Sequence, residues 1–502
     1  MKNTKVSSRR HFLKAMGIGA VSFTLSKSPL FAYESGMGGE KRPNILFCIA
    51  DDWGPDQAGI LGNPVIKTPN FDSIAKKGVL FTNAFVTTPS CTASRAAILT
   101  GQMPHRLGPA INLSSRWEKI PPLFTDLLSD NGYYVGYMRK GWGPGEHPNR
   151  KLNPAGKKFD NFERFLQEKP ENMPFFFWFG SYDPHRGYNR KLTEKMNIDK
   201  SKIPVPPYLP DKLVVREDLA DYYAEVQRFD VEVGQLLNIL LEKGLADNTM
   251  VVMTGDHGLP FPRAKCHLYD AGTKVPLAIR WGTRIKPGRR VKDLISFTDF
   301  APTFLDIAGI KIPSQMTGKS FLDILMSEKS GQIDLTRDKV FTERERHTWC
   351  HPEGKSFPVR ALRTKEFLYI YNFRPNLYPA GHPYLRRESK TPKGHVDCDE
   401  GPTKYYIIDN KNEQEITRFY KLAFDKRPQE ELYELEKDPY QMKNLAEDEK
   451  YLNILKKMRD KLKRWMEMTK DPRAEGETDI WDSKCVHLQP YADVKMPGYT
   501  EE

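Results

Sequence analysis

Two apolar runs of this sequence each end in residues that bind metals. The run 45–50 is continuously apolar, lies between Pro43 and Gly54, and is followed directly by Asp51 and Asp52. Such a run is typical of a strand buried on both faces of a parallel sheet. Ligands of open α/β sheets bind beyond the carboxyl ends of the strands. Two adjacent carboxylates there repel each other unless a cation lies between them, so the pattern predicts a metal site.

The second run covers residues 248–254 and leads into Asp256 and His257. It predicts another buried strand whose end carries ligands. Asp-His alone is weak evidence, but together with the first acid pair it predicts one shared cation. Hard oxygen donors dominate the combined set, which favours Ca²⁺ or Mg²⁺ over Zn²⁺.

The spacing of apolar runs and helix signals between and beyond these strands predicts an α/β fold. At 502 residues the chain is too long for one ordinary core, and its composition turns polar near 327–337. We therefore expect a catalytic domain over 40–330 and a smaller α+β subdomain over 335–490. Further strands are expected at 133–138, 174–180 and 275–280, helices at 70–77, 122–130, 219–243 and 298–308, antiparallel pairing at 361–371, an edge strand at 431–435 and a terminal helix at 448–469. The Pro- and Gly-rich stretch 375–402 is expected to be a loop near the mouth of the active site.

A reactive residue is indicated at Cys91. The preceding Thr88-Pro89-Ser90 supplies turn and N-cap residues, and 93–99 is a good helix former, so Cys91 should lie near a helix N-terminus. Arg95, one helical turn further on, falls on the same face. The place suits an anion, although a lone cysteine before a helix is also typical of a small buried side chain.

The formal charge of +12 suits a polyanionic partner, either nucleic acid or a sulfated or phosphorylated glycan. The sequence has no zinc-finger spacing, no aromatic RNA-binding signature and no dense basic run, which argues against nucleic acid. Its six cysteines include no CxxC pair, so a zinc ribbon and a dense disulfide framework are both disfavoured, while one or two disulfides remain compatible with the spacing. The sequence contains no apolar run of about 18 residues, so we expect no transmembrane segment after processing.

The N-terminus resembles a bacterial twin-arginine export signal over residues 1–32. Arg9 and Arg10 precede Phe12 and Leu13, and an apolar run follows over 15–25. The alternative is a basic tail before a buried helix. The signal implies use of the twin-arginine export machinery, which carries folded proteins, and a periplasmic, cell-surface or secreted mature protein.

Taken together, these motifs resemble the type I, formylglycine-dependent sulfatase family over nearly the whole mature chain. Cys91-Thr92-Ala93-Ser94-Arg95 is similar to the family's cysteine signature, Asp51-Asp52 and Asp256-His257 to its metal pairs, and 431–446 to its C-terminal segment. The resemblance implies an alkaline-phosphatase-like α/β/α sandwich with a C-terminal antiparallel sheet. It also implies a maturation enzyme that oxidises the cysteine to formylglycine, whose hydrated aldehyde attacks the sulfur of the substrate.

Carried over to this sequence, the resemblance implies one Ca²⁺ per chain and a set of catalytic residues. The metal ligands would be Asp51, Asp52, Asp256, His257 and the modified Cys91. Arg95 and Lys140 would stabilise the anion of the hydrate, and His185 and Lys265 would contact the sulfate, with His185 protonating the leaving group.

The sequence departs from the family pattern at two positions. Trp142 stands where the family has a histidine two residues after the lysine, so the group that helps collapse the sulfated intermediate is unidentified. Ala93 replaces the commoner proline of the signature, which bears on which maturation enzyme accepts the loop.

Within the family the pattern is nearest to the sulfamidases, the heparan N-sulfoglucosamine sulfohydrolases, through segments 181–186, 258–262 and 358–363. Candidates for binding an acidic sugar, each equally typical of a surface residue, are Arg186, His267, Arg344, His347 and His351. The alternatives are an O-sulfatase of an algal or host polysaccharide, a phosphoryl or phosphonate hydrolase of the same superfamily, and a non-catalytic protein that binds sulfated glycans.

Overall fold

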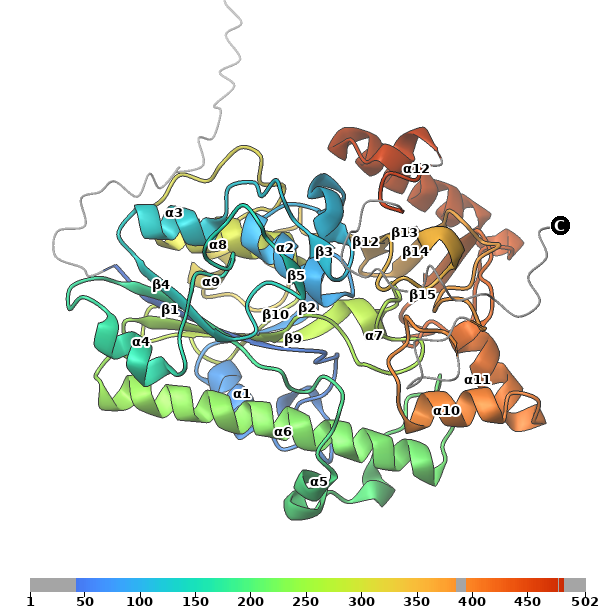
Figure 1. Ribbon diagram of the computed structural model, residues 1–502, viewed down its shortest axis with the longest axis horizontal. Coiled ribbons are helices and arrows are strands. Elements are labelled where there is room, and N and C mark those ends of the chain that lie inside the picture. Colours follow the sequence, from blue (N-terminus) through green and yellow to red (C-terminus); the bar gives the residue numbers. More distant parts are fainter. Residues whose placement is uncertain (1–41, 385–393, 477, 483–502) are drawn as a thin grey trace, which may run out of the picture. The chain divides into compact units, whose positions relative to one another are not determined.

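The computed structural model describes residues 42–384, 394–476 and 478–482, and these residues belong to one compact unit (Figure 1). The N-terminal stretch with the twin-arginine motif and the end of the range 335–490 lie outside the described residues, so the export signal and the domain limits stay predictions. No helix in the described part of the chain is both long enough and apolar enough to cross a bilayer.

A nine-stranded mixed sheet is the centre of the larger part of the chain. Its strands are β1 (Asn44–Ala50), β2 (Val79–Phe85), β4 (Tyr134–Arg139), β6 (Lys157–Lys158), β7 (Phe175–Gly180), β8 (Thr249–Gly255), β9 (Lys274–Trp281), β10 (Arg289–Val291) and β11 (Ile295–Ser296). The order is β10-β2-β9-β8-β1-β7-β4-β6, with β11 paired to β2. The pairs β8-β1, β1-β7 and β7-β4 are parallel, whereas β9 runs antiparallel to both β8 and β2. The ends of β1 and β8 therefore open at the same edge.

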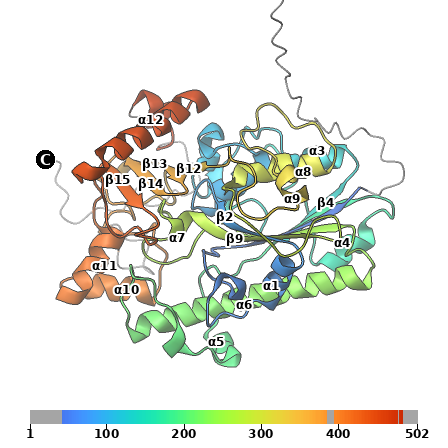
Figure 2. The same ribbon diagram turned by 180° about the vertical axis from the view of Figure 1, so that it is seen from behind.

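Helices cover both faces of this sheet. Alternate residues of its central strand point in opposite directions, and on both faces they are apolar. Ile45, Phe47 and Ile49 enter one core, and Leu46 and Cys48 enter the other. One layer of helices lies on each side in both views (Figures 1 and 2). On one side are α2 (Cys91–Thr100), α3 (Phe124–Asp130), α8 (Phe300–Ile307) and α9 (Leu322–Met326), and on the other are α1 (Pro69–Lys76), α4 (Phe162–Glu168) and α6 (Leu213–Glu242). The expected α/β/α sandwich is confirmed.

The C-terminal part contains the expected antiparallel sheet, ordered β12 (Lys339–Arg344), β13 (Val359–Thr364), β14 (Phe367–Asn372) and β15 (Glu430–Glu434). As predicted, β15 is an edge strand. One face of the sheet packs on α12 (Leu452–Thr469) through Leu362 and Tyr369. The other face packs on Leu268 and Tyr269 of the large part, so the small sheet rests directly against a loop that leaves β8.

The remaining short elements connect these layers. They are β3 (Ser115–Arg116) paired with β5 (Gly145–Glu146), α5 (Arg190–Met196), α7 (Asp270–Thr273), α10 (Pro402–Asp409) and α11 (Gln414–Phe424).

Two details differ from expectation or settle an alternative. Helix α6 begins at Leu213 rather than 219, directly after Lys212 at the N-cap position, so Asp218 lies inside the helix, where it pairs with Arg186. The described cysteines, which are all except Cys485, are free and buried, so the described part of the chain has no disulfide.

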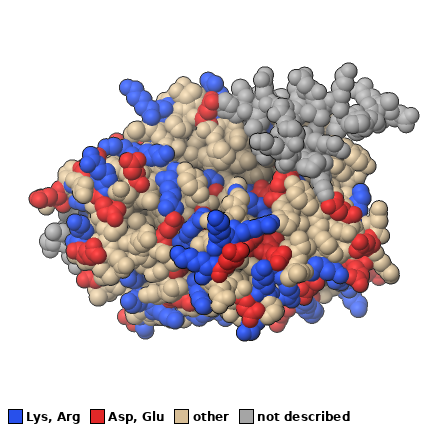
Figure 3. All heavy atoms as spheres, turned by 60° about the horizontal axis from the view of Figure 1, so that its bottom comes forward, with Lys and Arg blue, Asp and Glu red and all other residues tan. Residues whose placement is uncertain are grey.

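On the face shown in Figure 3, basic and acidic side chains are interspersed, so the excess positive charge forms no single-sign patch there.

Candidate active site

Cys91 is the first residue of α2, a helix that is buried along its whole length. Ser90 occupies the N-cap position with an extended backbone, as the sequence predicts, but its side chain makes no capping hydrogen bond. The hydroxyl lies instead 2.8 Å from Nδ1 of His347. The thiol therefore starts a rigid helix within the core rather than lying in a mobile loop.

Four predicted residues converge at the thiol. Cys91 Sγ lies 3.3 Å from Asp51 Oδ1 and 3.2 Å from His257 Nε2, which in turn lies 3.1 Å from Asp52 Oδ1. Potential ligand atoms of these four residues all lie within 4.8 Å of one another. Burial and the adjacent Asp51 carboxylate raise the pKa of the thiol well above its ordinary value.

The donor set fits a divalent cation. Nδ1 of His257 donates to the carbonyl of Gly258 at 3.2 Å, which leaves the lone pair of Nε2 facing the acids. Oδ1 of Asp52 is buried and accepts no hydrogen bond. An oxygen in that state is costly unless it binds a cation, and oxygen-rich sets with several carboxylates suit Ca²⁺ or Mg²⁺.

The backbone of Asp52 is held in the left-handed region, at φ +74°, which is uncommon for a residue other than glycine. Its N–H donates to Asp256 Oδ1 at 3.0 Å, and its carbonyl accepts from the Tyr222 hydroxyl at 3.0 Å. These bonds offset a strain of about 1–3 kcal/mol and turn the side chain toward His257.

Asp256 lies at the side of this cluster rather than within it. Its Oδ1 accepts from Asp52 and lies 3.7 Å from His257 Nε2, while its Oδ2 pairs with Arg95 Nε at 2.9 Å. Arg95 is fully buried and also approaches Asp51 at 3.8 Å. The predicted helical face thus brings Arg95 beside the thiol, whereas a role for Asp256 as a ligand stays a prediction.

Two lysines complete the cluster. Lys140 Nζ lies 2.5 Å from Asp51 Oδ2, and this neighbour outweighs burial and raises the pKa of the lysine. The approach depends on Gly180 at the end of β7, where a Cβ would lie 1.7 Å from the Lys140 carbonyl oxygen. Lys265 Nζ lies 3.0 Å from Asp52 and 2.8 Å from Asp399, and both carboxylates help to raise its pKa.

His185 faces the same space from the loop after β7. Its Nδ1 donates to the Arg186 carbonyl at 2.6 Å. A ring nitrogen of His185 lies within 4.8 Å of carboxylate oxygens of both Asp52 and Asp399. The second ring nitrogen is thus available for proton transfer near the cations.

The five residues predicted to bind the sugar either pair with buried acids or are themselves buried. The guanidinium of Arg186 forms a bidentate pair with Asp218, and that of Arg344 pairs with Asp397. Three histidines are buried, and burial lowers their pKa values, to about 3 for His347 and about 4 for His351, and well below the usual range for His267. A role in binding the sugar stays a prediction for all five.

His347 is the candidate of these five that touches the nucleophile loop, through Ser90. It follows β12, and the Glu343 N–H of that strand donates to the Thr87 carbonyl at 2.8 Å. The C-terminal sheet therefore supports the segment that leads into Cys91.

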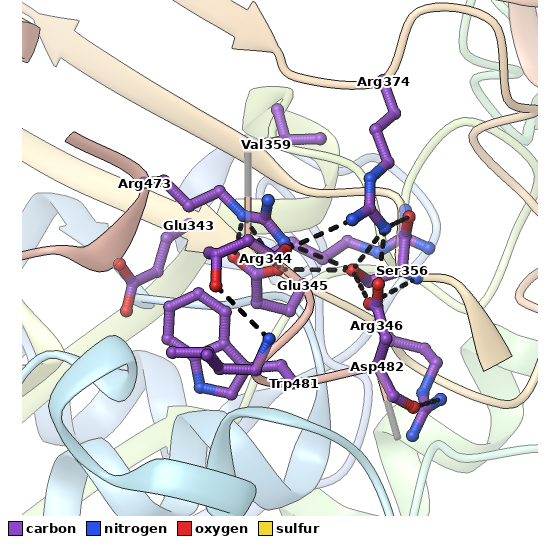
Figure 4. Close-up of polar contacts among 12 residues, drawn as sticks. Glu343, Arg344, Glu345, Arg346, Ser356, Val359, Arg374, Arg473, Trp481 and Asp482 are labelled. Carbon is purple, nitrogen blue, oxygen red and sulfur yellow. Dashed lines mark hydrogen bonds and ion pairs between the residues drawn. The ribbon is translucent and has the colours of Figure 1, made fainter. Parts of the chain in front are cut away.

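The end of β12 is fixed by a buried ionic network (Figure 4). Arg473 pairs with Glu345 at 2.6 Å, and Ser356 donates to Asp482 from both its N–H and its hydroxyl, at 2.9 and 2.5 Å. Both carboxylates and both partners come from the C-terminal half of the chain, where they tie Arg473 and Asp482 to the end of β12 and the following loop.

Trp142, at the position of the expected histidine, is buried. Its ring packs on Trp117 at 5.1 Å and on His147 at 6.1 Å between centroids. The side chain fills core space beside the site and offers no group for proton transfer.

One functional candidate was missed by the reasoning from sequence, namely Asp399. The predicted placement of 375–402 near the active-site mouth pointed to its loop, and the described part of that loop does reach Lys265. No motif distinguished Asp399 from the neighbouring acids.

Together these residues can bind a cation, hold an anionic group between Arg95, Lys140 and Lys265, and protonate a leaving group. The fold with this site defines a hydrolase of the alkaline-phosphatase-like class. A sequence profile of the sulfatase family matches residues 43–143 and 155–310, and a profile described as "N-sulphoglucosamine sulphohydrolase, C-terminal" matches 255–377. The chain belongs to the sulfatase family, and is a sulfate ester or sulfamate hydrolase.

Relatives with assigned names agree with this placement. The chain is 28% identical over 494 residues to an ulvan-active sulfatase of Formosa agariphila, covering 88% of this chain and 78% of the relative. It is 28% identical over 482 residues to human N-sulphoglucosamine sulphohydrolase, covering 86% and 91%. A solved structure of an enzyme with its substrate D-glucosamine-2-N,6-O-disulfate matches with a TM-score of 0.63 at 21% identity, covering 87% of this chain and 100% of that one.

Proposed function

We propose that this protein is an exported, Ca²⁺-dependent sulfatase that removes sulfate from a sulfated saccharide by means of a formylglycine made from Cys91. The observation that carries the proposal is that Cys91, Asp51, Asp52 and His257 come together. They lie beside three positively charged side chains, those of Arg95, Lys140 and Lys265. A thiol with a strongly raised pKa is a poor nucleophile, so Cys91 suits the role of a precursor.

The residues of the chain divide the chemistry between them. Asp51, Asp52 and His257 would hold the cation, which supplies positive charge to the sulfate oxygens. Arg95 and Lys140 stabilise negative charge at the position of residue 91, and Lys265 binds the sulfate. His185 carries the proton that the departing oxygen or nitrogen needs.

Modification of Cys91 is tested by mass analysis of the peptide that contains it, after expression together with a maturation enzyme. We expect an aldehyde in place of the thiol, and loss of turnover in Cys91→Ala with retained saccharide binding. Fully active protein with an unmodified thiol would refute the mechanism, and retained hydrolysis in the variant would refute the role of Cys91.

The saccharide substrate is proposed from the relatives, whose names include an ulvan-active sulfatase and an N-sulphoglucosamine sulphohydrolase. A panel of N-sulfated and O-sulfated saccharides separates sulfamidase from O-sulfatase activity by sulfate release. No release from sulfamates would remove the sulfamidase assignment, and faster turnover of phosphate esters than sulfate esters would favour the phosphoryl hydrolase.

Export through the twin-arginine route is proposed from Arg9 and Arg10. Cell fractionation should find the wild type outside the cytoplasm and Arg9→Lys/Arg10→Lys within it. Equal export of both forms would exclude this route.

A further inference from the structure

A carboxylate of the C-terminal part enters the active site at Asp399. One of its oxygens lies 2.8 Å from Lys265 Nζ, and its carboxylate lies within 4.8 Å of ligand atoms of Asp52 and His185. Its side chain is 19% exposed, compared with 0% for Asp52 and 3% for Asp51. Asp399 is thus the carboxylate of this site that is open to an incoming molecule.

Asp52, His185 and Asp399 do not form a second metal site. Lys265 Nζ lies between the two carboxylates, 3.0 Å from one and 2.8 Å from the other. An ammonium group already supplies the positive charge that a second cation would bring. Besides its pair with Lys265, the partly exposed carboxylate of Asp399 is therefore open to a contact with substrate.

The loop that carries Asp399 is firmly held on its N-terminal side. Asp397, two residues earlier, is fully buried and pairs with Arg344. It also accepts hydrogen bonds from the N–H and the hydroxyl of Thr348, both at 2.7 Å. These contacts fix the backbone just before Asp399.

The C-terminal side of the loop is held as well. Lys404 Nζ, which is buried, donates to the carbonyls of His395 and Cys398 at 3.1 and 2.9 Å. Thr403 donates to Asp218 through its N–H and its hydroxyl. Asp218 also receives both ends of the Arg186 guanidinium. Asp399 is therefore a preorganised group, and Arg186 and Arg344 act on the site through its loop.

A fixed, partly exposed carboxylate discriminates between neighbouring groups of a substrate. It accepts hydrogen bonds only, and charge-assisted bonds to hydroxyl or amino donors are about twice as strong as neutral ones. A second sulfate or a carboxylate at the same place would face it without a donor and be repelled. The basic side chains of the site, Arg95, Lys140 and Lys265, would attract any sulfate group, whatever sugar carries it.

We propose that Asp399 determines specificity by accepting a hydrogen bond from a hydroxyl or amino group of the sugar beside the scissile sulfate, and by rejecting sugars with a second anionic group there. The inference rests on the proposed function and narrows its substrate class. It assigns to the C-terminal part the recognition of the sugar, and to the α/β part the chemistry on sulfate.

The test compares wild type with Asp399→Asn, which keeps the shape and removes the charge. The probes are 4-nitrophenyl sulfate, which has no sugar, the monosulfated sugars N-sulfoglucosamine and glucosamine 6-sulfate, and the disulfated glucosamine 2-N,6-O-disulfate. Glu413→Gln on the exposed surface of the same part of the chain is the control for net charge.

We expect Asp399→Asn to lose about 10- to 100-fold in kcat/KM on the faster monosulfated sugar, the range for a hydrogen bond to a charged group, through a raised KM. Turnover of 4-nitrophenyl sulfate should change less than about threefold, and the ratio of disulfated to monosulfated activity should rise. Equal losses on the aryl and sugar substrates would overturn the proposal, since Asp399 would then act through Lys265. Unchanged activity on every probe would overturn it too. Wild type that is modified at Cys91 but inactive on all probes would refute the proposed function itself, and this inference with it.

Discussion

The buried pair of Arg344 and Asp397 should carry a large part of the stability of the C-terminal part. Both side chains are at most 2% exposed. Asp397→Asn keeps the shape and the contact with Thr348 but leaves the Arg344 charge buried without its partner. Breaking a buried pair in this way costs about 3–5 kcal/mol. We expect the free energy of unfolding to fall by that amount at neutral pH.

An independent magnitude comes from the titration of Asp397. Burial by itself would raise its pKa, but Arg344, His347 and Thr348 outweigh burial and hold it at about 2, compared with an ordinary 3.8. A shift of about two units corresponds to ~2.5 kcal/mol. Because the folded-state pKa is the lower one, this stabilisation is complete above about pH 4 and is lost as the pH falls toward 2. The difference in the free energy of unfolding between wild type and Asp397→Asn should therefore become smaller as the pH falls from about 4 to 2.

Equilibrium urea unfolding followed by tryptophan fluorescence measures both effects. The matched control is Glu217→Gln, which removes the same charge from a surface pair with Lys200, where both side chains are more than 40% exposed. Such pairs contribute about 0–1 kcal/mol. The reasoning is refuted if Asp397→Asn unfolds within 1 kcal/mol of wild type at pH 7, or if its deficit stays constant down to pH 2.

Three further outcomes follow from the site. His185→Gln should lower kcat about 10²- to 10⁴-fold on sugar sulfates but much less on 4-nitrophenyl sulfate, whose leaving group needs little protonation; equal losses in steady-state assays on both would exclude an acid role. Lys140→Met removes the shorter of the two ion pairs of Asp51 and the positive charge beside residue 91. The value of kcat should therefore fall by at least about 10²-fold with a smaller change in KM, and a change in KM alone would contradict a role in the transition state. Removal of Ca²⁺ with a chelator should lower both activity and the melting temperature, and calcium should restore both, whereas an unchanged melting temperature would argue against binding at the buried acids.

The α/β core and the metal-binding cluster could be predicted from the sequence because both depend on local patterns. Apolar runs identify buried strands, and residues directly after them must lie at the sheet edge, as Asp51 and His257 do. The start of α2 at Cys91 follows in the same way from its flanking residues. These features need no knowledge of which distant segments meet.

The environment of the sugar candidates could not be predicted, because it depends on contacts between distant segments. Arg344 pairs with Asp397, 53 residues further along the chain, and Arg186 pairs with Asp218, 32 residues further along. A basic residue near a motif looks the same in sequence whether it faces a ligand or a buried acid. Asp399 was missed for the same reason, since only the folded loop brings it to Lys265.

The charges of the assembled site explain why the cation and the exposed acid belong together. Asp51, Asp52, Asp256 and Asp399 carry four negative charges, while Arg95, Lys140 and Lys265 carry three positive ones. The proton that His185 carries to the leaving group adds one more positive charge, so the site without its metal ion has no net positive charge. One divalent cation makes the site net positive, and the site then attracts the ester anion. Calorimetric binding of inorganic sulfate should therefore require calcium, and Asp399→Asn should tighten it while weakening sugar recognition. Sulfate binding of equal strength in chelated protein would refute this charge balance.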